Sequence, residues 1–310
     1  MAASADAGAL LPRSAREAIL AWYAANGRRL AFRSTTDPYA VLVAELMAQQ
    51  TQAERASAAW TGWMARWPTV GDLAAAPVAD VLRAWAGLGY NRRALALHRA
   101  ARVIVEKHGG RVPDSLAELE ALPGVGRYTA RAVAATAFGR PVGAVDTNVR
   151  RVLGRIAGGG SDALAAVQLQ ALADAVVPPG RAAAWTHAVM DLGATRCLPK
   201  NPRCGDCPAA VWCRLAAGDG PQALSSATRR RRSAPAFPAT RRWLRGRVLE
   251  RARMAPDRAW VPYPEAIGAH PASAVGEAVL ALAGEGLLEA REGDDGIEAR
   301  LPVEAGRLAG

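Results

Sequence analysis

Residues 14–217 follow one pattern, in which apolar side chains recur every three or four positions and proline or glycine interrupts the run. That spacing puts apolar side chains on one face of an α-helix, whereas a half-buried β-strand would alternate apolar and polar residues. Such alternation is almost absent here. We therefore expect an all-α fold, with helices that include Val41–Trp60, Val78–Ala86 and Arg93–His108.

The helical pattern breaks at a linker. Residues 218–238 combine glycine, proline and serine with the run Arg229–Arg232. A run of like charges is usually a solvated segment, although four arginines can also contact phosphates. The break divides the chain into a helical domain at 14–217, a basic linker at 218–238 and a smaller domain at 239–304.

The smaller domain combines helices with one hairpin. Arg241–Met254 and Ser273–Ala283 have helical spacing. Short runs at 287–291 and 297–301 flank Gly293–Gly296, and an Asp-Gly turn between two such runs is typical of a β-hairpin. Helices followed by a hairpin predict a small winged-helix-like module.

Positive charge is in excess, because 39 Lys+Arg stand against 28 Asp+Glu and the formal net charge is +11. A basic excess suits a polyanionic partner such as nucleic acid, but charge alone leaves a merely solvated, arginine-rich surface equally open. With 51% hydrophobic and 22% charged residues, the composition excludes a disordered chain. No apolar run reaches the roughly 18 residues of a membrane span, and the N-terminus lacks a secretory pattern, so we expect a soluble intracellular protein.

All four cysteines fall in one window, with the spacing C-x6-C-x2-C-x5-C. Four thiols gathered locally in an intracellular protein suit a metal centre better than disulfides. Zinc ribbons usually offer two separated C-x2-C pairs, and only one is present, so the spacing favours a [4Fe–4S] cluster over zinc. The candidate ligands are Cys197, Cys204, Cys207 and Cys213.

A glycine turn and an aspartate stand before two successive helical stretches. Gly124 and Gly126 allow a tight turn whose backbone N–H groups can bind a phosphate at a helix start, although an ordinary interhelical turn would look the same. Asp146 ends a short apolar stretch and opens a helix. Its side chain could be an N-cap, which is common, or a carboxylate held in a cleft.

Glu45 lies inside an otherwise apolar helical stretch, Val41–Ala48. A charged group there is costly unless it is paired or held for chemistry. An exposed glutamate on the polar face of the helix fits the pattern equally well. If Glu45 and Asp146 share a site, two carboxylates in different environments can divide acid and electrostatic roles.

Taken together, these motifs resemble the helix-hairpin-helix base-excision DNA glycosylases that carry an iron–sulfur loop. Within that superfamily, the glutamine-rich helix around Glu45 is similar to that of the A/G-specific adenine DNA glycosylases. The segments that carry the resemblance are Leu122–Gly126, Val145–Arg151, Ala44–Gln52, Trp85–Tyr90 and Met190–Ala194, together with the cysteine spacing. The similarity covers about residues 14–215 and implies a two-lobed helical fold with a [4Fe–4S] cluster in the loop 197–213.

The resemblance also implies an activity. The family hydrolyses the N-glycosidic bond of adenine mispaired with 8-oxoguanine or guanine, in base excision repair. It implies a monomer that binds duplex DNA with mismatched or oxidised base pairs, binds no membrane and is found with the nucleoid in a bacterial cytoplasm. Related enzymes that cut the strand carry a lysine where this chain has Tyr128, and a phenol cannot form an iminium. We therefore expect a glycosylase without strong strand-cleaving activity.

Individual roles follow by position. Glu45 matches the acid that protonates adenine N7, and Asp146 matches the carboxylate that stabilises the cationic sugar. Tyr128 and Asn148 match groups that position these two. The positions that match DNA- or base-contacting residues of the family are Arg28, Arg33, Gln50, Tyr90, Gly124, Gly126 and His187.

Several positions depart from the family pattern. Phe32 and His187 replace residues near the base pocket, and Asn91 stands where a second aromatic residue often follows Tyr90. No Nudix-like domain, which reads 8-oxoguanine in many members, follows the linker. A thymine or uracil mismatch glycosylase on the same scaffold is the alternative, and a non-catalytic iron–sulfur DNA-binding protein is a more distant one.

Overall fold

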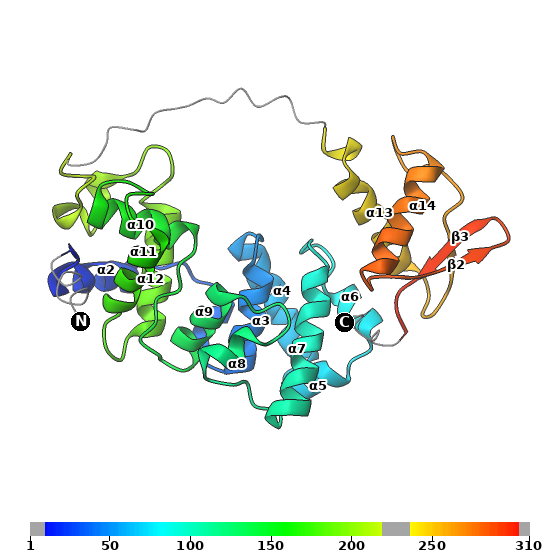
Figure 1. Ribbon diagram of the computed structural model, residues 1–310, viewed down its shortest axis with the longest axis horizontal. Coiled ribbons are helices and arrows are strands. Elements are labelled where there is room, and N and C mark those ends of the chain that lie inside the picture. The colour runs from blue at the N-terminus through cyan, green and yellow to red at the C-terminus, as the bar shows by residue number, and fades with distance from the viewer. Residues whose placement is uncertain (1–9, 219–235, 304–310) are drawn as a thin grey trace. The chain divides into compact units, whose positions relative to one another are not determined.

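The computed structural model describes residues 10–218 and 236–303, which form two compact units (Figure 1). The first unit contains described residues 10–45, 112–121 and 125–218, and the second contains 46–111, 122–124 and 236–303. The run Arg229–Arg232 and most of the predicted linker lie outside the described residues.

The first unit is built from helices around a shared apolar core. Its long helix α12 packs against α2, α9 and α10, and its buried side chains include Trp185, Val189 and Leu192. Burying a side chain of this size contributes roughly 1.5–3 kcal/mol. The elements are α2 (Arg13–Asn26), η1 (Ala31–Ser34), most of α3 (Pro38–Ala48), α8 (Leu116–Glu120), α9 (Arg127–Ala137), α10 (Thr147–Gly158), α11 (Ala166–Ala175), α12 (Ala182–Thr195), η2 (Cys204–Asp206) and η3 (Ala210–Trp212).

The second unit joins a helical layer to the C-terminal module. Trp63, Trp67 and Trp85 pack edge to face in its core. The elements are α4 (Ala53–Arg66), α5 (Val70–Ala75), α6 (Val78–Ala84), α7 (Arg92–His108), η4 (Phe237–Ala239), α13 (Arg241–Met254), β1 (Val261–Pro262), α14 (Ala272–Gly284), β2 (Glu289–Gly293) and β3 (Gly296–Arg300). The three strands are antiparallel in the order β1-β3-β2, with Ala299 opposite both Val261 and Ala290.

The C-terminal elements match the sequence expectation of two helices and a hairpin. Helix α13 has the predicted bounds, and α14 lies within one residue of them. The hairpin turns at Asp294 and Asp295, as the Asp-Gly pattern indicated.

The prediction of a single helix over Val41–Trp60 is wrong. Helix α3 ends at Ala48 and α4 begins at Ala53, with the backbone of Gln50 in the left-handed region at φ 53°. A residue in that conformation cannot continue a right-handed helix. No proline or glycine marks this break, so apolar spacing alone could not reveal it.

In the part of the chain that the structure describes, no helix is both long enough and apolar enough to cross a membrane.

Candidate active site

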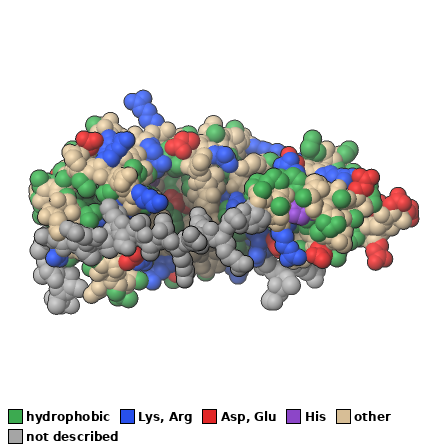
Figure 2. All heavy atoms as spheres, turned by 90° about the horizontal axis from the view of Figure 1, so that it is seen from above, with side chains coloured by type: hydrophobic (Ala, Val, Ile, Leu, Met, Phe, Trp, Pro, Cys, Tyr) green, Lys and Arg blue, Asp and Glu red, His purple; other side chains and the backbone are tan. Residues whose placement is uncertain are grey.

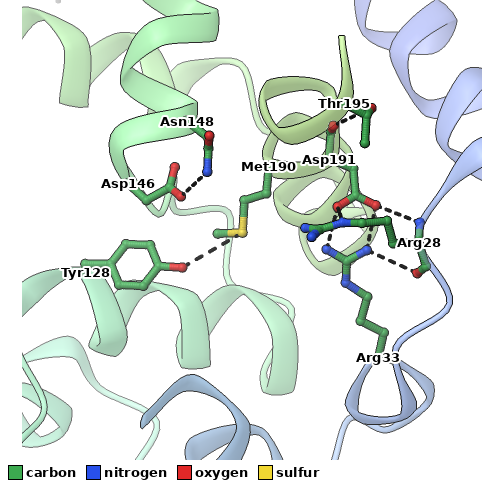
Figure 3. A network of polar contacts seen from close by, with 8 residues as sticks. All are labelled: Arg28, Arg33, Tyr128, Asp146, Asn148, Met190, Asp191 and Thr195. Atoms are coloured by element: carbon green, nitrogen blue, oxygen red, sulfur yellow. Dashed lines mark hydrogen bonds and ion pairs between the residues drawn. The ribbon is translucent and has the colours of Figure 1, made fainter. Parts of the chain in front are cut away.

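Asp146 is held at the N-terminus of α10. Its Oδ1 accepts a hydrogen bond from the backbone N–H of Val149 at 2.7 Å, so it is the N-cap of the helix. Its Oδ2 accepts a second bond from Asn148 Nδ2 at 3.0 Å. Both oxygens therefore have N–H donors, and the half-buried carboxylate is fixed in one orientation. Figure 3 shows the bond from Asn148.

Glu45 projects from α3, where its neighbours Val43, Ala44 and Leu46 are buried. Desolvation raises the pKa of its carboxyl to about 7, and the nearby charge of Asp146 adds to this rise. A hydrogen bond with Tyr128 and the charge of Arg33 act in the opposite direction without cancelling it. The carboxyl is therefore balanced between its protonated and ionised forms at neutral pH.

Tyr128 lies on the first turn of α9 and faces the two carboxylates. Burial, together with the charges of Glu45 and Asp146, raises the pKa of its hydroxyl well above the usual value, so the phenol stays protonated. Its oxygen also lies 3.8 Å from the sulfur of Met190 (Figure 3). Tyr128 is thus a neutral hydrogen-bond donor inside the acidic site.

Asp191 forms the centre of a charged network on α12 and is fully buried. It accepts bonds from the backbone N–H and Nε of Arg28 at 2.8 and 2.7 Å. Arg33 adds a bidentate pair, with Nη1 and Nη2 at 2.7 and 2.8 Å (Figure 3). Burial alone would raise the pKa of Asp191, but these arginines hold it below its ordinary value.

His187 stands one turn before Asp191 on α12, with its ring 6.4 Å from that of Tyr23. Desolvation and the charge of Arg33 lower the pKa of the imidazole to about 3. The side chain is therefore neutral at physiological pH and makes no hydrogen bond to another described residue. It offers one free donor and one free acceptor.

Helix α10 also connects Asn148 to the cysteine loop. Arg151 donates to Asn148 Oδ1 at 2.8 Å, to the carbonyl of Gly193 at 2.7 Å and to the carbonyl of Cys197 at 2.7 Å. Arg155, one turn further on, lies 3.4 Å from the Cys197 sulfur. The partner of Asp146 is thus itself oriented by hydrogen bonds.

The four cysteines line one cavity of the first unit, with apolar walls that include Val152 and Leu192. None forms a disulfide, and each thiol is half-buried. In the described residues, no group of three or more histidine, cysteine, aspartate or glutamate side chains is arranged to hold a metal ion. Four thiols around one cavity provide the donor set of an iron–sulfur cluster.

The glycine turn lies where the chain passes between the units. Gly124 has φ 79°, and a Cβ there would lie 2.6 Å from the Cβ of Ala96, so only glycine fits. Gly126 is exposed and is the N-cap of α9. Its space is open, since a Cβ at this position would meet nothing within 4 Å.

Gln50 and Tyr90 project from two loops of the second unit. Both are exposed and have left-handed backbones, with φ 53° and 44°, which is uncommon for residues other than glycine. Arg93 ties these loops together: it donates to the carbonyl of Gln49 and, at 3.1 Å each, to the carbonyls of Leu88 and Gly89.

The first unit connects seven of the predicted site residues through direct contacts and electrostatic effects. They are Arg28, Arg33, Glu45, Tyr128, Asp146, Asn148 and His187. Gln50, Tyr90 and Gly124 belong to the second unit. The sequence analysis gave no role to Asp191, Arg93 or Arg151. Asp191 could have been found, because it is an acidic residue inside an apolar helical stretch, which is the pattern that singled out Glu45.

The chain is similar to known proteins of one family. Residues 43–179 match the model of the HhH-GPD superfamily of base excision DNA repair proteins. The adenine DNA glycosylase of Mycobacterium tuberculosis is 44% identical over 246 residues, which cover 76% of this chain and 78% of that protein. The human adenine DNA glycosylase is also 44% identical, over 211 residues that cover 64% of this chain and 39% of the human protein.

A solved thermostable thymine-DNA glycosylase has the same fold, with a TM-score of 0.62 and 30% identity over 66% of this chain and 95% of its own. The helical fold and its matches define a base-excision DNA glycosylase, as the sequence indicated. Within that class, the chain belongs to the adenine DNA glycosylase family.

Proposed function

We propose that this chain removes adenine mispaired with guanine or 8-oxoguanine from duplex DNA by hydrolysing its N-glycosidic bond. The observation that carries the proposal is the pair of unlike carboxyl groups, Glu45 and Asp146, that influence each other in the first unit. One has a pKa raised to about 7, while the other has both oxygens held by N–H donors.

Glu45 supplies the proton. A general acid works best when its pKa lies near the operating pH, because enough of it is protonated and the proton still transfers readily. Protonation of the adenine ring makes the base a better leaving group. Tyr128 keeps its own proton and hydrogen-bonds to Glu45, so it positions the acid.

Asp146 stabilises the positive charge that develops on the sugar as the base departs. Its hydrogen bonds to Val149 and Asn148 fix the carboxylate before the reaction begins, so little reorganisation is needed when charge appears. The chain has two lysines, Lys107 and Lys200, and neither replaces Tyr128. The proposed enzyme therefore releases the base without an iminium intermediate and without cutting the strand.

Arg28, Arg33 and His187 form the side of the proposed base pocket that Asp191 organises. Asp191 fixes both guanidinium groups, so they present constant geometry to an extruded base. His187 has its donor and acceptor unused and replaces the amide or carboxylate common in the family. Neutral imidazole can hydrogen-bond to a base edge without placing a charge beside it.

The proposed partner is a duplex with a mismatched or oxidised base pair, bound by a monomer. Extruding a nucleotide costs a few kcal/mol, and least for a mispair. The exposed Gln50 and Tyr90 are proposed to enter the stack, and Gly124 and Gly126 to bind the backbone.

The four cysteines are proposed to bind a [4Fe–4S] cluster. Bound there, a cluster supplies four covalent anchors that fix the loop 197–213. The donor set fits, because only thiols among the metal-ligating side chains line the cavity and no disulfide competes for them. Purified protein should be brown with about four irons per chain, and a colourless protein with one zinc would refute the assignment.

One observation favours a second substrate class. The thermostable thymine-DNA glycosylase shares 30% identity with this chain, and Phe32 and His187 depart from the adenine-specific pattern. Release of thymine or uracil from mispairs with guanine is therefore the alternative function.

The test is base release from four duplexes, carrying A opposite 8-oxoguanine, A opposite G, T opposite G and U opposite G. We expect strand breaks in the adenine strand only after alkali. Breaks without alkali, together with a borohydride-trapped adduct, would contradict the monofunctional mechanism. Release of thymine or uracil in place of adenine would overturn the substrate and support the alternative.

A further inference from the structure

The loop that carries Tyr90 is contacted by the C-terminal module within the second unit. Arg242 on α13 donates from Nη1 to the Tyr90 hydroxyl at 3.2 Å, and its guanidinium lies 4.6 Å from the centre of the Tyr90 ring. Two kinds of contact, a hydrogen bond and a cation–π interaction, therefore act on the same side chain.

A second arginine of α13 contacts the next residue of the loop. Arg253 donates from Nη2 to Asn91 Oδ1 at 2.7 Å, and its carbonyl accepts a bond from Arg83. Asn91 stands where a second aromatic residue is common in the family. Asn91, which contacts Arg253 of the module, is therefore one of the positions at which this chain departs from the family pattern.

The arginines of α13 fall into two groups by their partners. The helix has six arginines, of which Arg241, Arg245 and Arg247 pair with glutamates of the module. Arg242, Arg251 and Arg253 pair with no described carboxylate, and of these three the exposed Arg242 donates to the hydroxyl of Tyr90. Its charge is not neutralised within the described residues.

The hairpin of the module has the opposite character. Residues 289–300 carry five acidic side chains and two arginines. On the face shown in Figure 2, acidic side chains gather at the end where β2 and β3 lie in Figure 1. A strand pair of this charge is unsuited to phosphates, so the arginine-rich α13 is better placed than the hairpin to act beside DNA.

We propose that the C-terminal module braces the loop Gly87–Asn91, and that Arg242 is a positioning residue that holds Tyr90 ready to enter the duplex. The backbone of Tyr90 is in a left-handed conformation that disfavours side chains, and such a conformation persists only where surrounding contacts impose it. Arg93 supplies contacts from one side, and Arg242 and Arg253 supply them from the module. This inference rests on the proposed function, in which Tyr90 enters the base stack.

The experiment compares R242A with R241A in the full chain. Arg241 is the adjacent residue of the same helix, and its exposed side chain forms an ion pair with Glu277. The R241A substitution therefore also removes one arginine from α13 but leaves the contacts between Arg242 and Tyr90 in place. The probe is a mismatched duplex with 2-aminopurine beside the target adenine, whose fluorescence rises when the neighbouring base leaves the stack. Adenine release is measured under single-turnover conditions on the same duplex.

R242A is expected to lower both the fluorescence rise and the release rate by about fivefold, whereas R241A stays within about twofold of wild type. R242K keeps the charge and a donor and should recover part of the loss. Because Y90F removes the hydroxyl that accepts the bond, R242A should have a smaller effect on Y90F than on wild type.

Equal effects of R242A and R241A, or losses that simply multiply in R242A/Y90F, would overturn the proposal. A wild-type protein that releases no adenine would overturn the proposed function instead. The fluorescence of the probe would still report whether Arg242 controls unstacking, so the two failures are distinguishable.

Discussion

Two acidic side chains of the first unit, Glu45 and Asp191, are both withdrawn from solvent but have opposite surroundings. Asp191 is fully buried and accepts hydrogen bonds from Arg28 and Arg33, which hold its pKa below the ordinary value although burial alone would raise it. Glu45 has a tyrosine hydroxyl as its hydrogen-bond partner, and desolvation raises its pKa to about 7.

The difference shows that burial alone does not make a carboxyl group an acid catalyst. Arg33 influences both groups, but its guanidinium is hydrogen-bonded to Asp191 and acts on Glu45 through its charge alone. Asp191 thus binds the guanidinium of Arg33, which would lower the pKa of Glu45 further if it were paired with Glu45 instead. A buried carboxyl group becomes part of a structural ion pair when arginines bind it, and a proton donor when they do not.

The largest expected effect separates the reactive carboxylates from the structural one. E45Q and D146N should each lower adenine release by at least about 10³-fold, since one loses the proton donor and the other the negative charge. Asparagine is as good an N-cap as aspartate, so D146N should keep α10 intact. Mismatched-duplex affinity, measured by fluorescence anisotropy, should stay within about twofold; a parallel loss of binding would make these residues structural.

Removing the structural carboxylate should instead destabilise the folded protein. D191N leaves two arginines without a counter-ion, and breaking a buried pair costs about 3–5 kcal/mol. The matched control is R181A, which breaks an ion pair with Glu17 whose side chains are 45% and 48% exposed, and exposed pairs contribute at most about 1 kcal/mol. Urea unfolding at pH 7 measures the free energy of unfolding of D191N and R181A. Equal losses in the two variants would contradict a special structural role for Asp191.

Glu45 should also make stability depend on pH. A carboxyl whose pKa is raised from 4.5 to about 7 on folding favours the folded state below its unfolded pKa, and this stabilisation is lost as the pH rises through 7. The stability of wild type minus that of E45Q should therefore fall by about 3 kcal/mol between pH 4 and pH 8. Urea unfolding of both proteins across this range measures the difference, and a constant value would contradict a raised pKa.

The smallest expected effect concerns Tyr128. Y128F removes a hydrogen bond that lowers the pKa of Glu45, so the alkaline fall of the release rate should move to higher pH, by up to about one unit. The rate at neutral pH should change only a few-fold. Y23F is the control, because Tyr23 lies against Arg33 on the Asp191 side, and a similar shift in Y23F would show that the effect is not specific.

Much of the fold could be predicted because it depends on local sequence. Apolar spacing predicted α7 and α13 to within one residue, and the Asp-Gly turn predicted the hairpin of β2 and β3. The break between α3 and α4 could not be predicted in this way. It depends on the left-handed Gln50 and on Arg93, which binds the carbonyl of Gln49 from 44 positions further along the chain.

The candidate site shows the same limit. The sequence predicts Asp146 either as an N-cap or as a site carboxylate. The structure shows the N-cap hydrogen bond, and the charge of Asp146 raises the pKa of Glu45, while the role as a site carboxylate stays a prediction. Motifs named Arg28 and Arg33, but their common partner Asp191 lies 163 and 158 positions away. Such long-range pairing sets the difference between the two carboxylates, and residue patterns do not contain it.

The most direct test is to measure the ionisation of Glu45 itself. A ¹³C-labelled glutamate side chain, assigned by comparison with E45Q, reports its pKa through the change of the carboxyl shift with pH. A midpoint near 7 is expected, because desolvation without a paired cation keeps the proton on the group. A midpoint at or below 4.5 would mean that Glu45 is ionised throughout the physiological range, and it would remove Glu45 as the proton donor.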